Sequence, residues 1–340
     1  MDPVRENGRG REFIRKAKMS ITDLEAADGA AETRPQEVGA ADDGRVRSFL
    51  PSPFIAASLP LRSVKATNFT RSYNNIKLTL TSASRIPFGK YGRLLLTILT
   101  THAVLSEGDG QVEVNYAKLG QLLDEMELPR SRGGKIQEQL ENFSKTSFIF
   151  EEAIETTTQK ILFKEYCERG EDTGGRVRVR KVSSGNIRFM SGFQYIQLDD
   201  GVRENAKNIS FRIMLSDEFV RFSKGHAVPV DYTVYKSIGS DVGKDLYAWL
   251  IYRNNALTSP LFIPRQSLIN QFMPVYDMSK KGNEKANYLY IIDQIRMIER
   301  SYYRELRVDI SPDGSGITLH KSPTPVVSSD RHYVLVTSNL

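Results

Sequence analysis

The first half of the chain alternates between strand-like and helix-like patterns of apolar residues. Residues 76–82 alternate apolar and polar side chains, which indicates a half-buried strand. Farther on, Leu119 and Leu122 recur at helical spacing behind Asn115, which we expect to act as an N-cap. The predicted elements are, in order, a strand over 76–82, a helix over 91–105, a short strand at 112–114, helices over 116–126 and 135–145, and strands over 147–153 and 160–166 around a turn at 155–159.

The second half repeats this order of elements. Pro264 suits the first position of a helix, and the sequence Pro-Asp-Gly-Ser-Gly at 312–316 predicts a tight hairpin turn. The predicted elements are a strand over 210–216, a helix over 245–257, a short strand at 261–263, a helix over 265–272, a long helix over 285–303, and hairpin strands over 306–310 and 316–320.

The two halves also share their spacing, because the short strand precedes the third helix by 23 residues in one and 24 in the other. Helix, strand, helix, helix, hairpin is the order of a winged helix, a helix-turn-helix followed by a β-wing. We therefore predict an α+β protein with two tandem winged-helix domains with β-hairpin wings, over 48–208 and 209–323. A disordered N-terminal tail over 1–47 and a C-terminal tail over 324–340 flank them. Residues 167–208 fit neither half and are predicted to form an extended wing or insertion, with strands at 176–181, 186–190 and 193–198.

Charge is distributed in blocks along the chain, which has a net charge of +6. Residues 1–19 carry six basic and three acidic side chains, whereas 20–44 carry one basic and seven acidic. Such a segment buries too little apolar surface to offset its chain entropy, which predicts disorder. We favour a passive leader over a DNA-contacting arm. Residues 45–107 then carry nine basic side chains against one acidic, and 108–166 carry seven against eleven.

Composition excludes several classes of protein. Hydrophobic residues make up 40% of the 340 and charged residues 26%, which is typical of a globular protein. The longest compact apolar run, around Leu94–Leu96, is far shorter than the roughly 20 residues of a membrane span, and the N-terminus has no apolar signal region. Cys167 is the only cysteine, which excludes a disulfide framework and a multi-cysteine zinc site. We expect a cytoplasmic bacterial protein.

The third helix of the second half offers the best candidate surface for reading DNA. Its apolar positions fall on one arc, which predicts the core side: Tyr288, Ile291, Ile292, Ile295, Ile298 and Tyr302. The opposite side and the end of the helix are expected to present Asn283, Asn287, Tyr290, Gln294, Arg300 and Arg304. Asn and Gln bond adenine edges, and Arg prefers guanine. Further candidate DNA contacts are Lys280 and Lys281 before the helix, and Arg307 and Lys321 at the ends of the wing. The competing interpretation is an ordinary solvated helix face.

The third helix of the first half is less suited to reading bases. Glu138 and Glu141 are expected to point outward, where they would repel phosphates. Arg130, Arg132 and Lys135 at the start of this helix are candidates for a phosphate clamp, helped by the helix N-terminus. The acidic surroundings equally favour a protein interface, and both interpretations stay open.

Residues 176–181, Arg-Val-Arg-Val-Arg-Lys, form a predicted basic strand within the insertion. A two-stranded ribbon with this charge is able to contact DNA. An exposed edge strand that charge protects from aggregation is the commoner use of such a pattern, and we favour it slightly.

The chain lacks the common enzyme motifs. The segment from Gly239 to Lys244 resembles a phosphate loop, but it has three residues between its glycines and Asp245 after the lysine, so we reject it. No two of the histidines are spaced as a metal pair, and no Gly-x-Ser-x-Gly elbow occurs. We expect no catalytic activity, no cofactor and no bound metal. A relaxase or nuclease remains an alternative, for which Tyr302 and Tyr303 are the only tempting tyrosine pair.

Several short motifs together resemble one family. They are residues 77–82, the run Ile-Pro-Phe-Gly-x-Tyr-Gly-Arg-Leu-Leu-Leu at 86–96, Val-Pro-Val-Asp at 228–231, Asp-Leu-Tyr-Ala-Trp-Leu at 245–250 with Tyr252-Arg253, and Ile263-Pro264. Their order and spacing resemble RepA-type plasmid replication initiators (the RepA C-terminal family) from about residue 59 to about 323. Residues 1–47, much of 167–208 and the end of the chain are not covered by the resemblance.

The resemblance implies a function. Such initiators are tandem winged-helix proteins that bind repeated double-stranded sites, called iterons, at a plasmid origin and recruit the host initiator DnaA and the replicative helicase. In related initiators the monomer starts replication and the dimer represses it, with the first winged helix as the dimer face. A homodimer of this chain is therefore an expected form. The alternative function is a winged-helix transcriptional repressor that acts on its own promoter.

Overall fold

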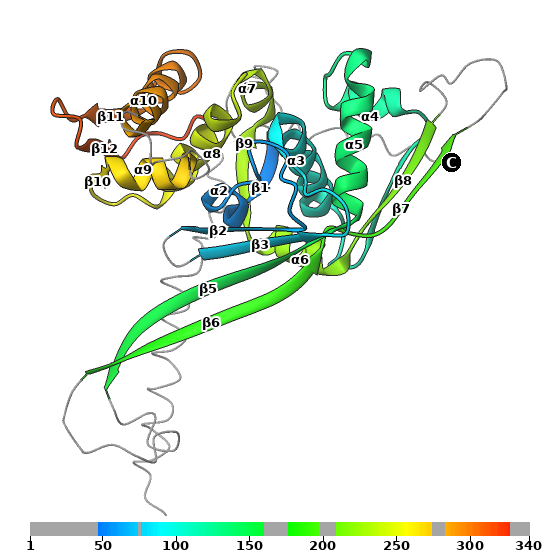
Figure 1. Ribbon diagram of the computed structural model, residues 1–340, viewed down its shortest axis with the longest axis horizontal. Coiled ribbons are helices and arrows are strands. Elements are labelled where there is room, and N and C mark those ends of the chain that lie inside the picture. Colours follow the sequence, from blue (N-terminus) through cyan, green and yellow to red (C-terminus); the bar gives the residue numbers. More distant parts are fainter. Residues whose placement is uncertain (1–46, 74–75, 160–175, 198–208, 274–282, 327–340) are drawn as a thin grey trace, which may run out of the picture. The chain divides into compact units, whose positions relative to one another are not determined.

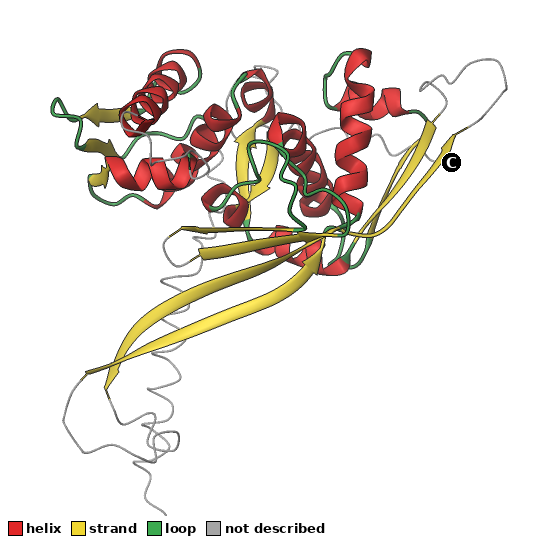
Figure 2. Cartoon of the chain, in the orientation of Figure 1, coloured by secondary structure: helices red, strands yellow, loops and turns green. Residues whose placement is uncertain are grey.

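We describe a computed structural model of the chain. The structure describes residues 47–73, 76–159, 176–197, 209–273 and 283–326. These residues form helices and antiparallel sheets (Figures 1 and 2). Of the predicted N-terminal tail, only Arg47 is among the described residues. Residues 327–340 of the predicted C-terminal tail also lie outside the described residues.

The first half-domain, as we call the structure built around α3, comprises three helices and a three-stranded sheet. Its elements are α3 (Gly89–Leu105), β4 (Val112–Tyr116), α4 (Leu119–Glu125), the short 3₁₀ turn η1 (Arg130–Arg132), α5 (Gly133–Ser144), β7 (Met190–Gln197) and β8 (Ile209–Leu215). The strand order in the sheet is β4-β8-β7. Strand β4 precedes α4, whereas β7 and β8 follow α5 in sequence. In the sheet β8, the last of the three strands, lies between the other two.

The second half-domain, built around α8, repeats this plan with the same order of elements. Its elements are α8 (Asp241–Ala256), β10 (Leu261–Pro264), α9 (Arg265–Phe272), α10 (Asn283–Ser301), β11 (Arg307–Ile310) and β12 (Gly316–His320). The strand order β10-β12-β11 again places the last strand in the centre. The turn between β11 and β12 contains Gly314 at φ 72°, a left-handed conformation that glycine adopts without strain.

The pairing of β8 corrects the predicted start of the second half. Residues 210–216 were expected to open the second domain, but Phe211 lies opposite Tyr116 of β4 and Tyr195 of β7. A boundary after residue 208 would therefore cut the sheet of the first half-domain. Local pattern predicts that a strand exists, but its partner is chosen by packing of the whole chain.

A second sheet combines two strands that precede α3 with two strands that lie between α5 and β7. It consists of β2 (Asn68–Tyr73), β3 (Ile76–Ser82), β5 (Thr146–Gln159) and β6 (Arg176–Arg188), in the order β2-β3-β5-β6. The predicted turn at 155–159 is wrong, because this stretch continues β5 and pairs with β6. The basic residues 176–181 do form a strand, whereas the predicted strand at 160–166 lies outside the described residues. Figure 1 shows β5 and β6 continuing as a two-stranded ribbon past the ends of β2 and β3.

Shorter elements precede the first half-domain in sequence or lie between β8 and α8. They are β1 (Arg47–Pro51), α2 (Ser52–Ala56), α6 (Asp217–Gly225), β9 (Ala227–Asp231) and α7 (Tyr232–Ser237), with β1 paired antiparallel to β9. Three helices begin where a side-chain oxygen accepts a hydrogen bond from a first-turn amide, namely Ser216 before α6, Asp231 before α7 and Ser240 before α8. The N-cap predicted at Asn115 is wrong, because Asn115 lies in β4 opposite Arg212 and Lys118 precedes α4.

Aromatic side chains fill the centre of the first half-domain. The ring of Phe148 lies 5.0 Å from Phe54, 4.8 Å from Phe189 and 5.0 Å from Phe222, measured between ring centroids. These residues come from β5, α2, the position directly after β6, and α6, so the four-stranded sheet is part of the core. Within the described residues, no helix is both long and apolar enough to cross a membrane.

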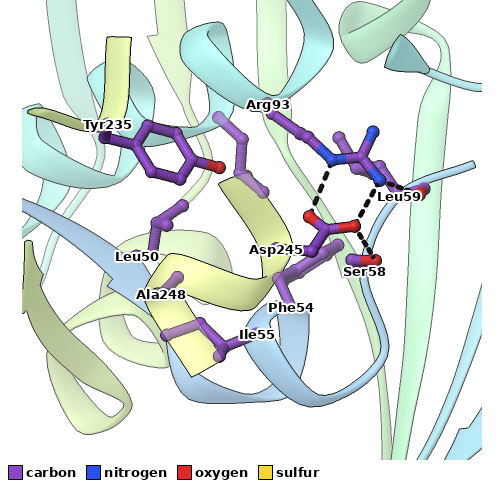
Figure 3. A pocket seen from close by; sticks show the side chains of 10 residues that line it. Leu50, Phe54, Ile55, Ser58, Leu59, Arg93, Tyr235, Asp245 and Ala248 are labelled. Atoms are coloured by element: carbon purple, nitrogen blue, oxygen red, sulfur yellow. Dashed lines mark hydrogen bonds and ion pairs between the residues drawn. The ribbon is translucent and has the colours of Figure 1, made fainter. Parts of the chain in front are cut away.

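A buried ion pair joins α3 of the first half-domain to α8 of the second. Arg93 donates from Nε to Asp245 Oδ1 at 2.7 Å and from Nη2 to Asp245 Oδ2 at 2.8 Å, and Ser58 Oγ donates to the same carboxylate at 2.7 Å (Figure 3). The two charged side chains are 2% and 5% exposed. Burial alone would lower the pKa of Arg93, but the charge of Asp245 holds it above its ordinary value.

Two more buried cations surround this pair. Arg71 on β2 donates to Ser58 O at 3.1 Å and also to the carbonyl of Gln271 on α9. Burial lowers the pKa of Arg71 to about 10. Lys244 donates to the carbonyls of Tyr235 and Lys236 at the end of α7, and burial lowers its pKa to about 7. The junction is therefore polar and hydrogen-bonded, and not a simple apolar contact.

Candidate nucleic-acid interface

The core side of α10 agrees closely with its apolar pattern. Five of the six predicted core residues are buried, and the exception is Tyr302, which is half-buried. Tyr303 is fully buried instead, where its hydroxyl donates to the Pro323 carbonyl at 2.8 Å and also meets the amide of Asn254. The long helix ends at Ser301, so the apolar periodicity does not extend to these last tyrosines.

The predicted reader face of α10 does not point to solvent as a whole. Asn287 is 8% exposed, and Tyr290 donates from its hydroxyl to Ser240 Oγ at 3.0 Å. Gln294 is half-buried, with its amide oxygen directly beside Gly243 in α8. This stripe therefore packs on the N-terminal end of α8. The sequence pattern shows the apolar arc that faces the core, but it does not show that a second, polar side of α10 packs on α8.

The outward stripe of α10 lies next to the predicted one. It consists of residues spaced by four, four, three and four along the helix: Lys285, Leu289, Asp293, Arg296 and Arg300. Leu289 is 49% exposed, and Tyr290 at its border is 39% exposed. Three cations against one carboxylate give this stripe a net positive charge. Of the predicted reader residues, Tyr290, Arg300 and Arg304 are exposed.

Contacts at the start of α10 hold it against the wing and α9. Glu284 pairs with Arg265 Nε at 3.0 Å, and the Arg265 guanidinium lies 5.2 Å from the centre of the Tyr288 ring. The Tyr288 hydroxyl donates to Gly316 O at 2.9 Å, and burial raises its pKa. The predicted contacts Lys280 and Lys281 lie outside the described residues, and for Asn283 only its place at the start of α10 is described.

The two predicted basic residues of the wing have different surroundings. Arg307 begins β11 and is exposed. Lys321 instead donates to Asn254 O at 2.9 Å and Asn255 O at 3.0 Å, which are carbonyls of the last turn of α8. Lysine at this end satisfies free helix carbonyls and interacts favourably with the helix dipole. Its ammonium group is therefore already engaged in the fold. Arg304, beyond the end of α10, is exposed.

The cations at the start of α5 are exposed but mostly paired. Arg130 donates to Asp124 Oδ2 at 2.7 Å and to the Gly120 carbonyl. Lys135 lies 3.8 Å from Glu138, which also contacts Arg85 at 3.3 Å. Arg132 is exposed. Arg130 and Lys135 thus have partners on different helices, Arg130 on α4 and Lys135 on α5.

The carboxylates predicted to point outward from α5 are half-buried. Glu138 is bracketed by Arg85 and Lys135, so its charge is largely balanced, and Glu141 accepts from Gln137 at 3.2 Å. Repulsion of phosphates by this helix is therefore weaker than the bare sequence suggests.

Several groups with reactive potential are held inside the described part of the fold. His102, Glu125 and Tyr116 form a buried cluster, in which Glu125 contacts His102 Nε2 at 2.8 Å and accepts from Tyr116 at 2.6 Å. Burial, reinforced by the charge of Glu125, raises the pKa of Tyr116 well above its ordinary value. Lys244 of the phosphate-loop-like segment is buried in α8. Over the described ranges, no group of three or more His, Cys, Asp or Glu side chains is arranged to hold a metal ion.

Comparisons with known proteins give a partial likeness. No family model matches the chain, and no curated protein matches it. Among solved structures, it resembles the crystal structure of domains 2 and 3 of RctB, with 12% identity and a TM-score of 0.47 over 82% of this chain and 99% of that one. A second crystal structure of RctB domains 2-3 gives 11% identity and a TM-score of 0.40 over 78% of this chain and 94% of that one.

Proposed function

We propose that the protein is a plasmid replication initiator that binds repeated double-stranded sites at its origin through two winged-helix domains. The observation that carries the proposal is the duplicated plan of the half-domains. Each has the order helix, strand, helix, helix, strand, strand, and each sheet places its last strand in the centre. This is the order of a helix-turn-helix followed by a wing, in which the third helix enters the major groove.

In this proposal α10 is the principal reader, through its outward stripe and not through Asn287 and Gln294. Arg296 and Arg300 are exposed and suit guanine or phosphate, and Leu289 suits a thymine methyl group. Lys285 lies in the first turn of the helix, where phosphates approach in a helix-turn-helix. The short side chain of Ala286, also exposed, leaves room for close approach to the groove.

The first half-domain is proposed to contact the DNA backbone and a second copy of the chain. The basic residues of η1 and the start of α5 supply the charge, and the balanced pair of Glu138 with Arg85 removes much of the repulsion. The dimer, DnaA and the replicative helicase are partners that the resemblance to RepA-type initiators implies. We propose that the protein acts without catalysis, since the reactive groups described above are buried.

Footprinting of the purified protein on the DNA that flanks its gene tests the proposed function. An initiator is expected to protect several direct repeats at regular spacing, with a steep dependence on salt. Protection of a single site over the gene's own promoter would favour the repressor alternative. Site-specific nicking in magnesium or manganese that copurifies with the protein would contradict both.

A further inference from the structure

A groove on the first half-domain borders the proposed backbone contact, and Lys135 at the start of α5 belongs to both. It has a volume of about 300 Å³ and lies between the segment 61–63, the start of α3 and α5. Its apolar surface comes from Leu61, Phe88 and Tyr91, all half-buried. The apolar side chains are thus open to a ligand at one side.

Hydrogen bonds fix the walls of this groove in place. Gly89 donates from its backbone nitrogen to Pro60 O at 2.9 Å, which ties the segment before 61–63 to α3. Phe88 donates from its backbone nitrogen to Gln139 Oε1 at 3.0 Å, and Gln139 is 3% exposed. The start of α3 is thereby tied to α5. A ligand would meet a preformed site and would not have to order it, which lowers the cost of binding.

The rim of the groove is positively charged. Arg62, Lys90 and Lys135 are exposed along it. The single carboxylate among the lining residues is Glu138, which already contacts Lys135 and Arg85. The first turn of α3 contains no acidic residue and has no side-chain cap, so its positive end adds to the same field.

We propose that this groove binds a short acidic peptide segment of a partner protein, with one or two apolar side chains on the floor and carboxylates along the rim. The charge of the rim calls for an anionic ligand, and the apolar floor calls for hydrocarbon or aromatic side chains. A DNA backbone supplies anionic groups for the rim but no apolar group for the floor of the groove. The proposal does not depend on the proposed initiator function.

The test uses the full chain and fluorescence anisotropy with three labelled peptides of about 12 residues, a length that lies in a groove as one helix or extended segment. The first peptide alternates Asp and Glu with Leu and Phe. The second replaces each Leu and Phe by Ser, and the third replaces each Asp and Glu by Lys. The first alone is expected to bind in the micromolar range, and added salt is expected to weaken it. Equal binding of the second would overturn the role of the floor.

Two variants locate the binding site. Arg62→Glu with Lys90→Glu reverses two rim charges and is expected to weaken the first peptide by at least about tenfold. Ser63→Trp keeps the charge and fills the groove, and it is expected to block the same peptide. Arg296→Glu on α10 is the matched control and is expected to change peptide affinity less than about twofold, because it lies outside the groove.

The outcomes separate the possible ligands. Wild-type affinity in both groove variants, with thermal unfolding confirming that they fold, would overturn the proposal. Loss of random duplex DNA binding in Arg62→Glu with Lys90→Glu, without any binding of the first peptide to the wild type, would assign the groove to DNA. Retained DNA binding with lost peptide binding would support the proposal and leave the initiator function to its own test.

Discussion

Replacement of Asp245 by asparagine tests how the two half-domains are joined. The carboxylate accepts hydrogen bonds from Arg93 Nε, Arg93 Nη2 and Ser58 Oγ, each between 2.7 and 2.8 Å. An asparagine keeps one acceptor oxygen but turns an NH₂ group toward these donors. It also removes the carboxylate that is paired with the guanidinium of Arg93, which is 2% exposed.

Breaking a buried ion pair from one side costs about 3–5 kcal/mol of unfolding free energy. Arg93 keeps its hydrogen bonds to Leu59 O at 2.7 Å and Pro60 O at 3.1 Å, so we expect the lower end of this range. A loss of about 3 kcal/mol is a large share of the roughly 5–15 kcal/mol that stabilises a folded protein.

Urea denaturation followed by circular dichroism measures this loss. The matched control is Glu151→Gln, which breaks the 2.7 Å pair with Lys77 at side chains that are 30% and 50% exposed, and it is expected to cost under about 1 kcal/mol. Arg93→Met combined with Asp245→Leu removes both charges and is expected to recover most of the lost stability. A cost for Asp245→Asn no larger than that of the control would refute the reasoning.

Three further predictions concern α10, Lys321 and Lys244. In gel-shift titrations, we expect Arg296→Ala and Arg300→Ala each to weaken binding to cognate DNA by about 1–3 kcal/mol. Asn287→Ala is expected to leave the affinity unchanged within the error of the titration. The reverse result would show that the side of α10 with Asn287 and Gln294 reads the DNA. Lys321→Met is expected to cost about 1 kcal/mol of unfolding free energy without changing the salt slope of DNA binding, and a slope lower by about one would instead place Lys321 on a phosphate. Burial lowers the pKa of Lys244 to about 7 from an ordinary 10.5. Between these two pH values the unfolded chain keeps a proton on Lys244 that the folded chain loses, so the free energy of unfolding rises with pH. Relative to Lys244→Met, the wild type should gain up to about 1.4 kcal/mol per pH unit from pH 7 to 9 in urea melts, and parallel profiles would show that Lys244 is not the titrating group.

The elements that depend on local pattern could be predicted from the sequence. The strand over Ile76–Ser82 is confirmed with its predicted bounds, and the helices α3, α5, α8 and α9 begin and end within a few residues of theirs. Helical and strand periods, together with Pro264 and the hairpin turn at 312–316, act over distances of a few residues. A single sequence contains that information.

The partners of these elements were decided by the tertiary structure. The strand β8 lies opposite β4, with Leu215 against Val112, and its alternating pattern gives no sign of that distant partner. The stretch 155–159 was predicted as a turn from its polar residues, but pairing with β6 keeps it extended. Strand pairing depends on which edge is free after the whole chain has packed.

The same division holds for the candidate interface. The sequence identified α10 as the third helix of a repeated unit and placed its apolar arc correctly, because burial of apolar surface dominates helix packing. It did not determine which polar side faces solvent, since Asn287 and Arg296 are both polar and hydropathy does not separate them. In the tertiary structure Tyr290 and Gln294 contact the start of α8, Asn287 is buried, and Arg296 is exposed.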